Sequence, residues 1–123
     1  MTLAGGAALI DTGLIHGDVT LGQADSLDAS QGGVAGTIRA SSEDLFEFGG
    51  HFGAETIDGF TAGTGATHDT LQFATSDFAN YAALRGAMSQ AGSDVTIKLD
   101  ATDSITLSHV SLSSVVSADF KFG

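Results

Sequence analysis

Short apolar clusters recur between glycine, serine and acidic residues from Leu9 to Phe73, and each spans about three to five residues. Such clusters are shorter than ordinary sandwich strands. The apolar residues Leu27, Ile38, Phe46 and Ile57 follow one another at steps of 11, 8 and 11 residues. A step near nine to eleven, with one inward apolar side chain each time, is typical of stacked coils that share a narrow core. The sequence therefore predicts a mainly β fold, a parallel β-roll or β-helix.

The glycine content supports this prediction, and the net charge argues against some classes of binding partner. The chain of 123 residues has 17 glycines and no proline, which indicates regular turns rather than loose linkers. Its formal net charge of −11 would repel nucleic acid and anionic membrane surfaces. No cysteine is present, so neither disulfides nor thiol chemistry is expected. No apolar run is long enough to span a membrane.

An acidic residue repeatedly stands two positions before the inward apolar residue. Such a residue lies where a turn ends and a strand begins, and aspartate caps turns well because its side chain accepts nearby backbone N–H groups. Clustered carboxylates can instead repel one another until a hard cation such as Ca²⁺ joins them. Both interpretations remain open at this level. The repeated units are Asp25-Ser26-Leu27, Asp44-Leu45-Phe46, Glu55-Thr56-Ile57 and Asp69-Thr70-Leu71.

This Asp-x-apolar pattern resembles the nonapeptide of the RTX, or haemolysin-type calcium-binding, family, Gly-Gly-x-Gly-x-Asp-x-apolar-x. The segments 19–28 and 40–48 resemble degenerate copies, with Ala24, Ala40 and Ser42 in place of glycines. The segments 53–60 and 68–71 resemble the region that follows the roll in many proteins of that family. Glu55 stands where that family usually has aspartate. The resemblance implies an extracellular roll that binds Ca²⁺. The ligands it implies are Asp25, Asp44, Glu55, Asp58 and Asp69.

A capping unit is expected after the roll. Thr75 or Ser76 can begin a helix whose apolar stripe reaches Met88, with Gly92 as its stop. The alternating segments 95–99 and 104–107 predict a β-hairpin. The expected domain is continuous, with a degenerate β-roll at 1–60 and a C-terminal capping and secretion-signal region at 61–123.

In RTX proteins an uncleaved C-terminal region serves as the type I secretion signal, often an acidic residue followed by hydrophobic ones. The terminal residues Asp119, Phe120 and Phe122 are similar to that pattern. The resemblance therefore implies a secreted, extracellular or cell-surface protein that is exported by type I secretion machinery.

No catalytic arrangement is predicted, since the sequence contains neither a Gly-x-Ser-x-Gly elbow nor metal-type histidine spacing. The leading hypothesis is a non-enzymatic calcium-binding module that caps a β-roll. The alternative is a self-assembling subunit of an extracellular fibre or surface layer, stacked head to tail through the open roll end. Polysaccharide binding is a third hypothesis, although the chain has no tryptophan and one tyrosine.

Overall fold

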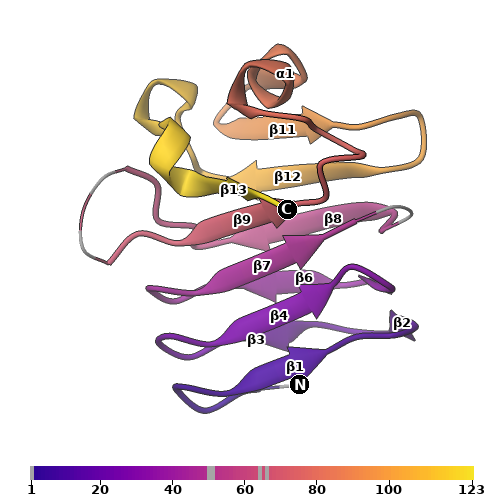
Figure 1. The fold of residues 1–123 in the computed structure, drawn as a ribbon. Coiled ribbons are helices and arrows are strands. Elements are labelled where there is room, and N and C mark those ends of the chain that lie inside the picture. Colours follow the sequence, from indigo (N-terminus) through magenta and orange to yellow (C-terminus); the bar gives the residue numbers. More distant parts are fainter. Residues whose placement is uncertain (1, 50–51, 64, 66) are drawn as a thin grey trace.

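Parallel strands stack into a roll whose two main sheets lie one behind the other (Figure 1). The computed structural model describes residues 2–49, 52–63, 65 and 67–123. The first sheet has the order β1-β4-β7-β9-β13, and the second β10-β11-β12-β8-β6-β3. The first comprises β1 (Ala8–Ile10), β4 (Ser26–Ala29), β7 (Leu45–Phe48), β9 (Thr70–Phe73) and β13 (Phe120–Phe122). The second comprises β3 (Val19–Thr20), β6 (Thr37–Arg39), β8 (Ala54–Asp58), β10 (Met88–Ala91), β11 (Asp94–Lys98) and β12 (Ser104–Ser108).

The register confirms the predicted coil period. Leu27 of β4 pairs with Phe46 of β7, and Ile38 of β6 pairs with Ile57 of β8. Both pairs are 19 residues apart, which is the sum of an 11-residue and an 8-residue step. The alternating steps therefore carry the chain from one sheet to the other and back. A short third pair, β2 (Leu14–Ile15) with β5 (Gly33–Val34), lines one corner of the coils.

The core is a set of inward columns. Val19, Ile38, Ile57 and Leu107 form one column across the second sheet, and all four are fully buried. Burying such a side chain contributes about 1.5–3 kcal/mol. The facing column of the first sheet contains Leu27, Phe46, Leu71 and Phe120. Alternate residues of each strand point inward, as the sequence pattern predicted.

The second sheet continues beyond the roll as an antiparallel cap. β12 pairs in parallel with β8 and antiparallel with β11, and this confirms the predicted hairpin. The sheet then ends in β10, which pairs antiparallel with β11. The strand β10 was not predicted from the sequence, because its residues were assigned to a helix.

The predicted helix is shorter than expected. α1 spans only Tyr81–Gly86, and the side chain of Asn80 caps it by accepting the N–H of Ala83 at 3.0 Å. Neither Thr75 nor Ser76 begins this helix, and Met88 lies in β10 rather than on a helical stripe. The chain leaves the helix because residues 88–91 gain a strand partner in β11. Gly92 has φ +63° in the turn between the two strands, so it is not a helix stop.

The C-terminal strand returns to the first sheet. After β12 the chain forms two short 3₁₀ turns, Leu112–Ser114 and Ser117–Asp119, and then β13 pairs in parallel with β9. The free edges of the first sheet are therefore β1 and β13. The helix α1 lies above the last strands, at the end of the molecule opposite to β1 (Figure 1).

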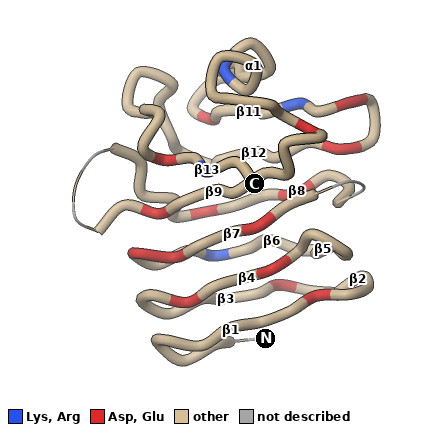
Figure 2. The backbone as a smooth tube through the Cα atoms, in the orientation of Figure 1, with Lys and Arg blue, Asp and Glu red and all other residues tan. Residues whose placement is uncertain are grey.

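Acidic residues recur on successive coils, and basic residues are few (Figure 2). The side chains of Arg39, Arg85, Lys98 and Lys121 are all exposed. Within the described part of the chain, no helix is both long and apolar enough to cross a membrane.

Candidate functional site

A column of buried aspartates runs along the turn that precedes the first sheet. Asp25, Asp44 and Asp69 immediately precede β4, β7 and β9, and each side chain is at most 1% exposed. The strand register stacks them because Ser26, Leu45 and Thr70 are paired neighbours. The repeated Asp-x-apolar unit therefore places one carboxylate per coil in the same position.

Backbone N–H groups occupy both oxygens of each carboxylate in this column. Asp44 Oδ1 accepts the N–H of Asp25 at 2.9 Å, and Asp44 Oδ2 accepts the N–H of Ser41 at 2.8 Å. Asp69 repeats the arrangement, with the N–H of Asp44 and that of Thr61, both at 2.8 Å. Asp25 accepts the N–H groups of Ala7 and Gly22. Each aspartate therefore links its own turn to the preceding coil.

This geometry is a poor match to a cation. Ca²⁺ takes six to eight oxygen ligands, whereas this column presents each carboxylate to two N–H donors. Carboxylates that accept several backbone N–H groups are compensated without metal. Ligation of Ca²⁺ by Asp25, Asp44 and Asp69 stays a prediction, and it would require these hydrogen bonds to be exchanged.

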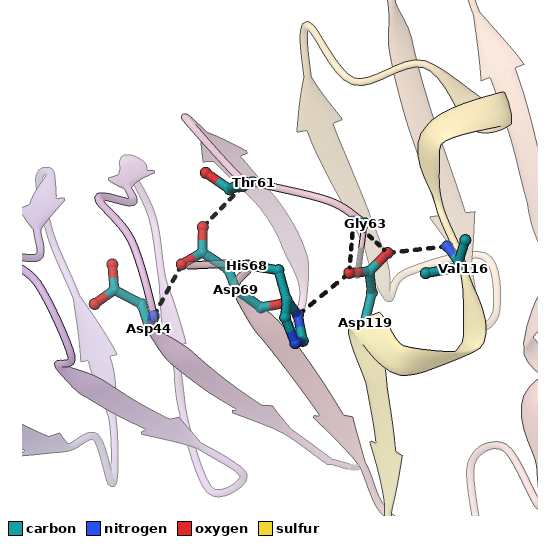
Figure 3. A network of polar contacts seen from close by, with 7 residues as sticks. All are labelled: Asp44, Thr61, Gly63, His68, Asp69, Val116 and Asp119. Atoms are coloured by element: carbon teal, nitrogen blue, oxygen red, sulfur yellow. Dashed lines mark hydrogen bonds and ion pairs between the residues drawn. The ribbon is translucent and has the colours of Figure 1, made fainter. Parts of the chain in front are cut away.

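Asp119 ties the C-terminal strand to the roll (Figure 3). This residue is fully buried, and its Oδ1 accepts the N–H of Gly63 at 2.9 Å while its Oδ2 accepts that of Val116 at 2.9 Å. His68 Nδ1 lies 3.4 Å from Asp119 Oδ1 and 2.9 Å from the carbonyl oxygen of Asp69. The contacts of Asp119 thus join the tail to the segment that leads into β9.

A second acidic group lies at the corner lined by β2 and β5. Asp11 is 5% exposed and Glu55 is 2% exposed. Asp11 Oδ1 accepts the N–H of Gly13 at 3.0 Å, while its buried Oδ2 has no hydrogen-bond partner among the described residues. Both oxygens of Glu55 share one donor, the N–H of Val34, at 3.0 and 3.1 Å. This corner is less well compensated than the aspartate column.

Glycines make room for these two carboxylates. A Cβ on Gly32 would lie 2.7 Å from Asp11 Oδ1, and a Cβ on Gly33 would lie 3.1 Å from Glu55 Oε1 and 2.5 Å from the carbonyl oxygen of Phe52. A carbon at these separations would overlap the oxygens. The Gly32-Gly33 pair therefore permits two acidic side chains to enter one corner of the roll.

Burial changes the acidity of several carboxyls. Burial raises the pKa of Glu55 to about 7, against the lowering effect of the Val34 N–H, and the charge of Asp11 raises it further. Burial also raises the pKa of Asp69 to about 6, opposed by the N–H groups of Thr61 and Asp44. The pKa of Asp44 is raised by burial as well.

The residues predicted to bind calcium lie at three separate places in the structure. Asp25, Asp44 and Asp69 come together in one column, whereas Glu55 lies in the β2/β5 corner. Asp58 lies apart from both, at the end of β8, and its half-exposed carboxylate faces His109 Nδ1 at 3.7 Å. Groups of three or more metal-type side chains are not found in the described part of the chain.

Asp11 was missed because no apolar residue stands two positions after it, where Gly13 lies. The signal that could have found it is the Gly32-Gly33 pair one coil later, which leaves space beside it. Asp103, 2% exposed and accepting the N–H of Gly53 at 2.8 Å, does stand two positions before the apolar Ile105, but it was missed because it was assigned to a hairpin turn.

In calcium-free buffer, the free energy of unfolding is expected to fall as the pH rises from about 5 to about 8. The pKa of Glu55 is raised from 4.5 to about 7 on folding. Its contribution to stability is therefore complete below its unfolded pKa and is lost as the pH rises through its folded pKa, at most roughly 3 kcal/mol. The raised pKa of Asp69 also makes the free energy of unfolding fall as the pH rises. Urea unfolding followed by circular dichroism at several pH values measures this slope.

Glu55→Gln is the matched control, since an amide oxygen can still accept the N–H of Val34 without titrating. The variant should show a shallower pH dependence than the parent chain. A parent chain that gains stability between about pH 5 and 8 would contradict the assignment.

Comparison with known proteins shows that this chain is similar in fold, but not detectably in sequence family, to a protein of known structure. No protein family matches the sequence, and no curated protein matches it. The solved structure of the extracellular lipase LipA from Serratia marcescens is similar over 99% of this chain, with a TM-score of 0.53 and 18% sequence identity. This chain corresponds to 21% of that lipase. The likeness therefore shows that the parallel β-roll with its cap is a fold also found within an extracellular lipase.

Proposed function

We propose that this chain is a non-enzymatic extracellular module: a Ca²⁺-binding β-roll with a closed end, exported by a type I route with its C-terminal tail as an uncleaved signal. The fold similarity to part of an extracellular lipase supports an extracellular setting. The buried acidic groups on the turns support a role for a hard cation. The RTX-like sequence pattern supports the export route.

One observation carries the proposal, namely that the tail is built into the roll. Phe120 packs in the column of Leu71, Phe122 pairs with Phe73, and Asp119 is fully buried. A tail held in this way is inaccessible to a transporter in the folded state. Export of this chain would therefore precede the docking of β13, and completion of the fold would follow outside the cell.

Deleting residues 119–123 is expected to abolish export and leave the protein in the cells. The measurement is the fraction of protein in the medium, by immunoblot, from bacteria that carry a type I transporter. Asp44→Ala is the control, because it weakens the fold at a distance from the tail. If this variant is also retained, or if the truncated chain still reaches the medium, the tail is not the signal.

A second candidate is a subunit that assembles through its open end. The strand β1 is an uncovered sheet edge, and the nearby side chains of Ile10 and Leu14 are 71% and 59% exposed. Residues 1–10 carry no charged side chain, so the edge lacks the charges that usually prevent strand pairing. Light scattering tests this candidate: Ile10→Lys should reduce the mass of any assembly, whereas a chain that is monomeric at all concentrations would exclude it.

A further inference from the structure

The acidic turns of this roll divide into two kinds. We propose that the corner containing Asp11 and Glu55 binds one hard divalent cation, with Ca²⁺ as the natural probe, while the Asp25–Asp44–Asp69 column folds without metal. This inference rests on the calcium-binding part of the proposed function and names the place where the ion would bind.

The supply of hydrogen-bond donors separates the two groups. In the column, each carboxylate receives two backbone N–H groups, one on each oxygen. In the corner, Asp11 receives one and the two oxygens of Glu55 share another. Asp11 Oδ2 is completely buried and has no partner in the part of the chain that the structure describes. A buried carboxylate oxygen without a donor is costly unless it is protonated or binds a cation.

In the part of the chain that the structure describes, no lysine or arginine side chain pairs with the carboxylates of this corner. All four lysine and arginine side chains are exposed, and Arg39 forms an ion pair with Asp18 rather than with Asp11 or Glu55. The two corner carboxyls also repel each other, since the charge of Asp11 raises the pKa of Glu55. Among the described residues nothing else balances these charges, so a proton or an external cation is needed to compensate them.

The corner has the ligand chemistry that a hard cation requires. Besides the carboxylates, the carbonyl oxygens of Gly13 and Phe52 lie against Gly32 and Gly33, where a Cβ would otherwise be. Carboxylate and carbonyl oxygens, completed by water, are the ligands of Ca²⁺. Asp11 and Phe52 come from coils on either side of Gly32-Gly33, so one ion would join successive coils at this corner.

Thermal unfolding of the purified chain at about pH 8, in chelator and in rising Ca²⁺, tests the proposal. The parent chain should melt at higher temperature as Ca²⁺ is added, and calorimetric titration should give one site per chain. Asp11→Asn and Glu55→Gln should each weaken Ca²⁺ binding about tenfold or more and lose most of the rise in Tm. Glu47→Gln is the matched control: it also removes one negative charge, from a partly buried position in β7 outside the corner, and should behave like the parent chain.

A second readout separates ligation from a merely structural role. In chelator, Asp11→Asn and Glu55→Gln should melt above the parent chain because they remove buried repulsion, and in saturating Ca²⁺ they should melt below it. Such a reversal in the order of melting temperatures between chelator and Ca²⁺ supports ligation at this corner. If Ca²⁺ stabilises the parent chain and both corner variants equally, the site is elsewhere although the proposed function stands. If the parent chain neither binds Ca²⁺ nor is stabilised by it, the calcium-binding function and this inference both fail.

Discussion

Asp44→Ala is expected to lower the free energy of unfolding by roughly 2–5 kcal/mol, because it leaves two backbone N–H groups without an acceptor inside the roll. These donors belong to Asp25 and Ser41, at 2.9 and 2.8 Å from the carboxylate. Asp44 is 1% exposed, so water has little access to replace it. A loss of this size is a large share of the stability of a small domain. Chemical unfolding at about pH 6, followed by circular dichroism, measures it.

Glu47→Ala is the appropriate control on the same coil. Glu47 lies in β7 on the outward side of the strand and is only partly buried, so its replacement should change stability by less than about 0.5 kcal/mol. The loss of stability for Asp44→Asn should lie between those for Asp44→Ala and Glu47→Ala, since the amide oxygen can still accept one of the two N–H groups. Equal losses for Asp44→Ala and Glu47→Ala would show that the column does not hold the coils together.

Gly36→Ala is expected to destabilise the roll by roughly 2–4 kcal/mol through steric overlap. A Cβ at this position would fall against the carbonyl oxygen of Gly17 and Oδ1 of Asp18 on the preceding coil. The Gly17 carbonyl also accepts the N–H of Gly36 at 3.1 Å, so the two coils cannot separate without losing that bond. The effect should appear as a lower urea midpoint with an unchanged slope.

Gly13→Ala provides the comparison, because it makes the same chemical change in open space. No atom lies within 4 Å of a Cβ on Gly13, and its φ is not in the left-handed region. That variant should be neutral or more stable by about 0.5 kcal/mol, since alanine restricts the unfolded chain. Similar losses in both variants would mean that the close approach of the coils is not what Gly36 permits.

The roll itself could be predicted because its signal is local and repeated. The spacing from Leu27 to Ile38 and Phe46 fixes which residues point inward, and the observed 19-residue register follows from it. The hairpin that includes β11 and β12 was also predictable, since Val95 and Ile97 alternate with polar residues. The helix was overextended because residues 75–92 fit a helical stripe, and a strand partner for Met88–Ala91 cannot be seen from that segment alone.

The role of the acidic residues depended on contacts between coils. Asp25, Asp44 and Glu55 follow the same Asp-x-apolar rule or its close variant, but the first two receive two N–H donors each and Glu55 receives one. Which donors reach a carboxylate is set by the turn of the neighbouring coil, about 19 residues away in the chain. No local pattern contains that information.

The sequence by itself determined that this chain forms stacked coils with inward apolar columns and acidic turns, because alternation along each strand and the step between strands are properties of a single segment. Only the tertiary structure decided that β13 joins β9, that Asp119 is buried beside His68, and that the carboxylates of Asp11 and Glu55 lie against the adjacent Gly32 and Gly33. The physical reason is that burial and hydrogen-bond supply at these residues come from segments far away in the chain, and become defined only when the coils stack.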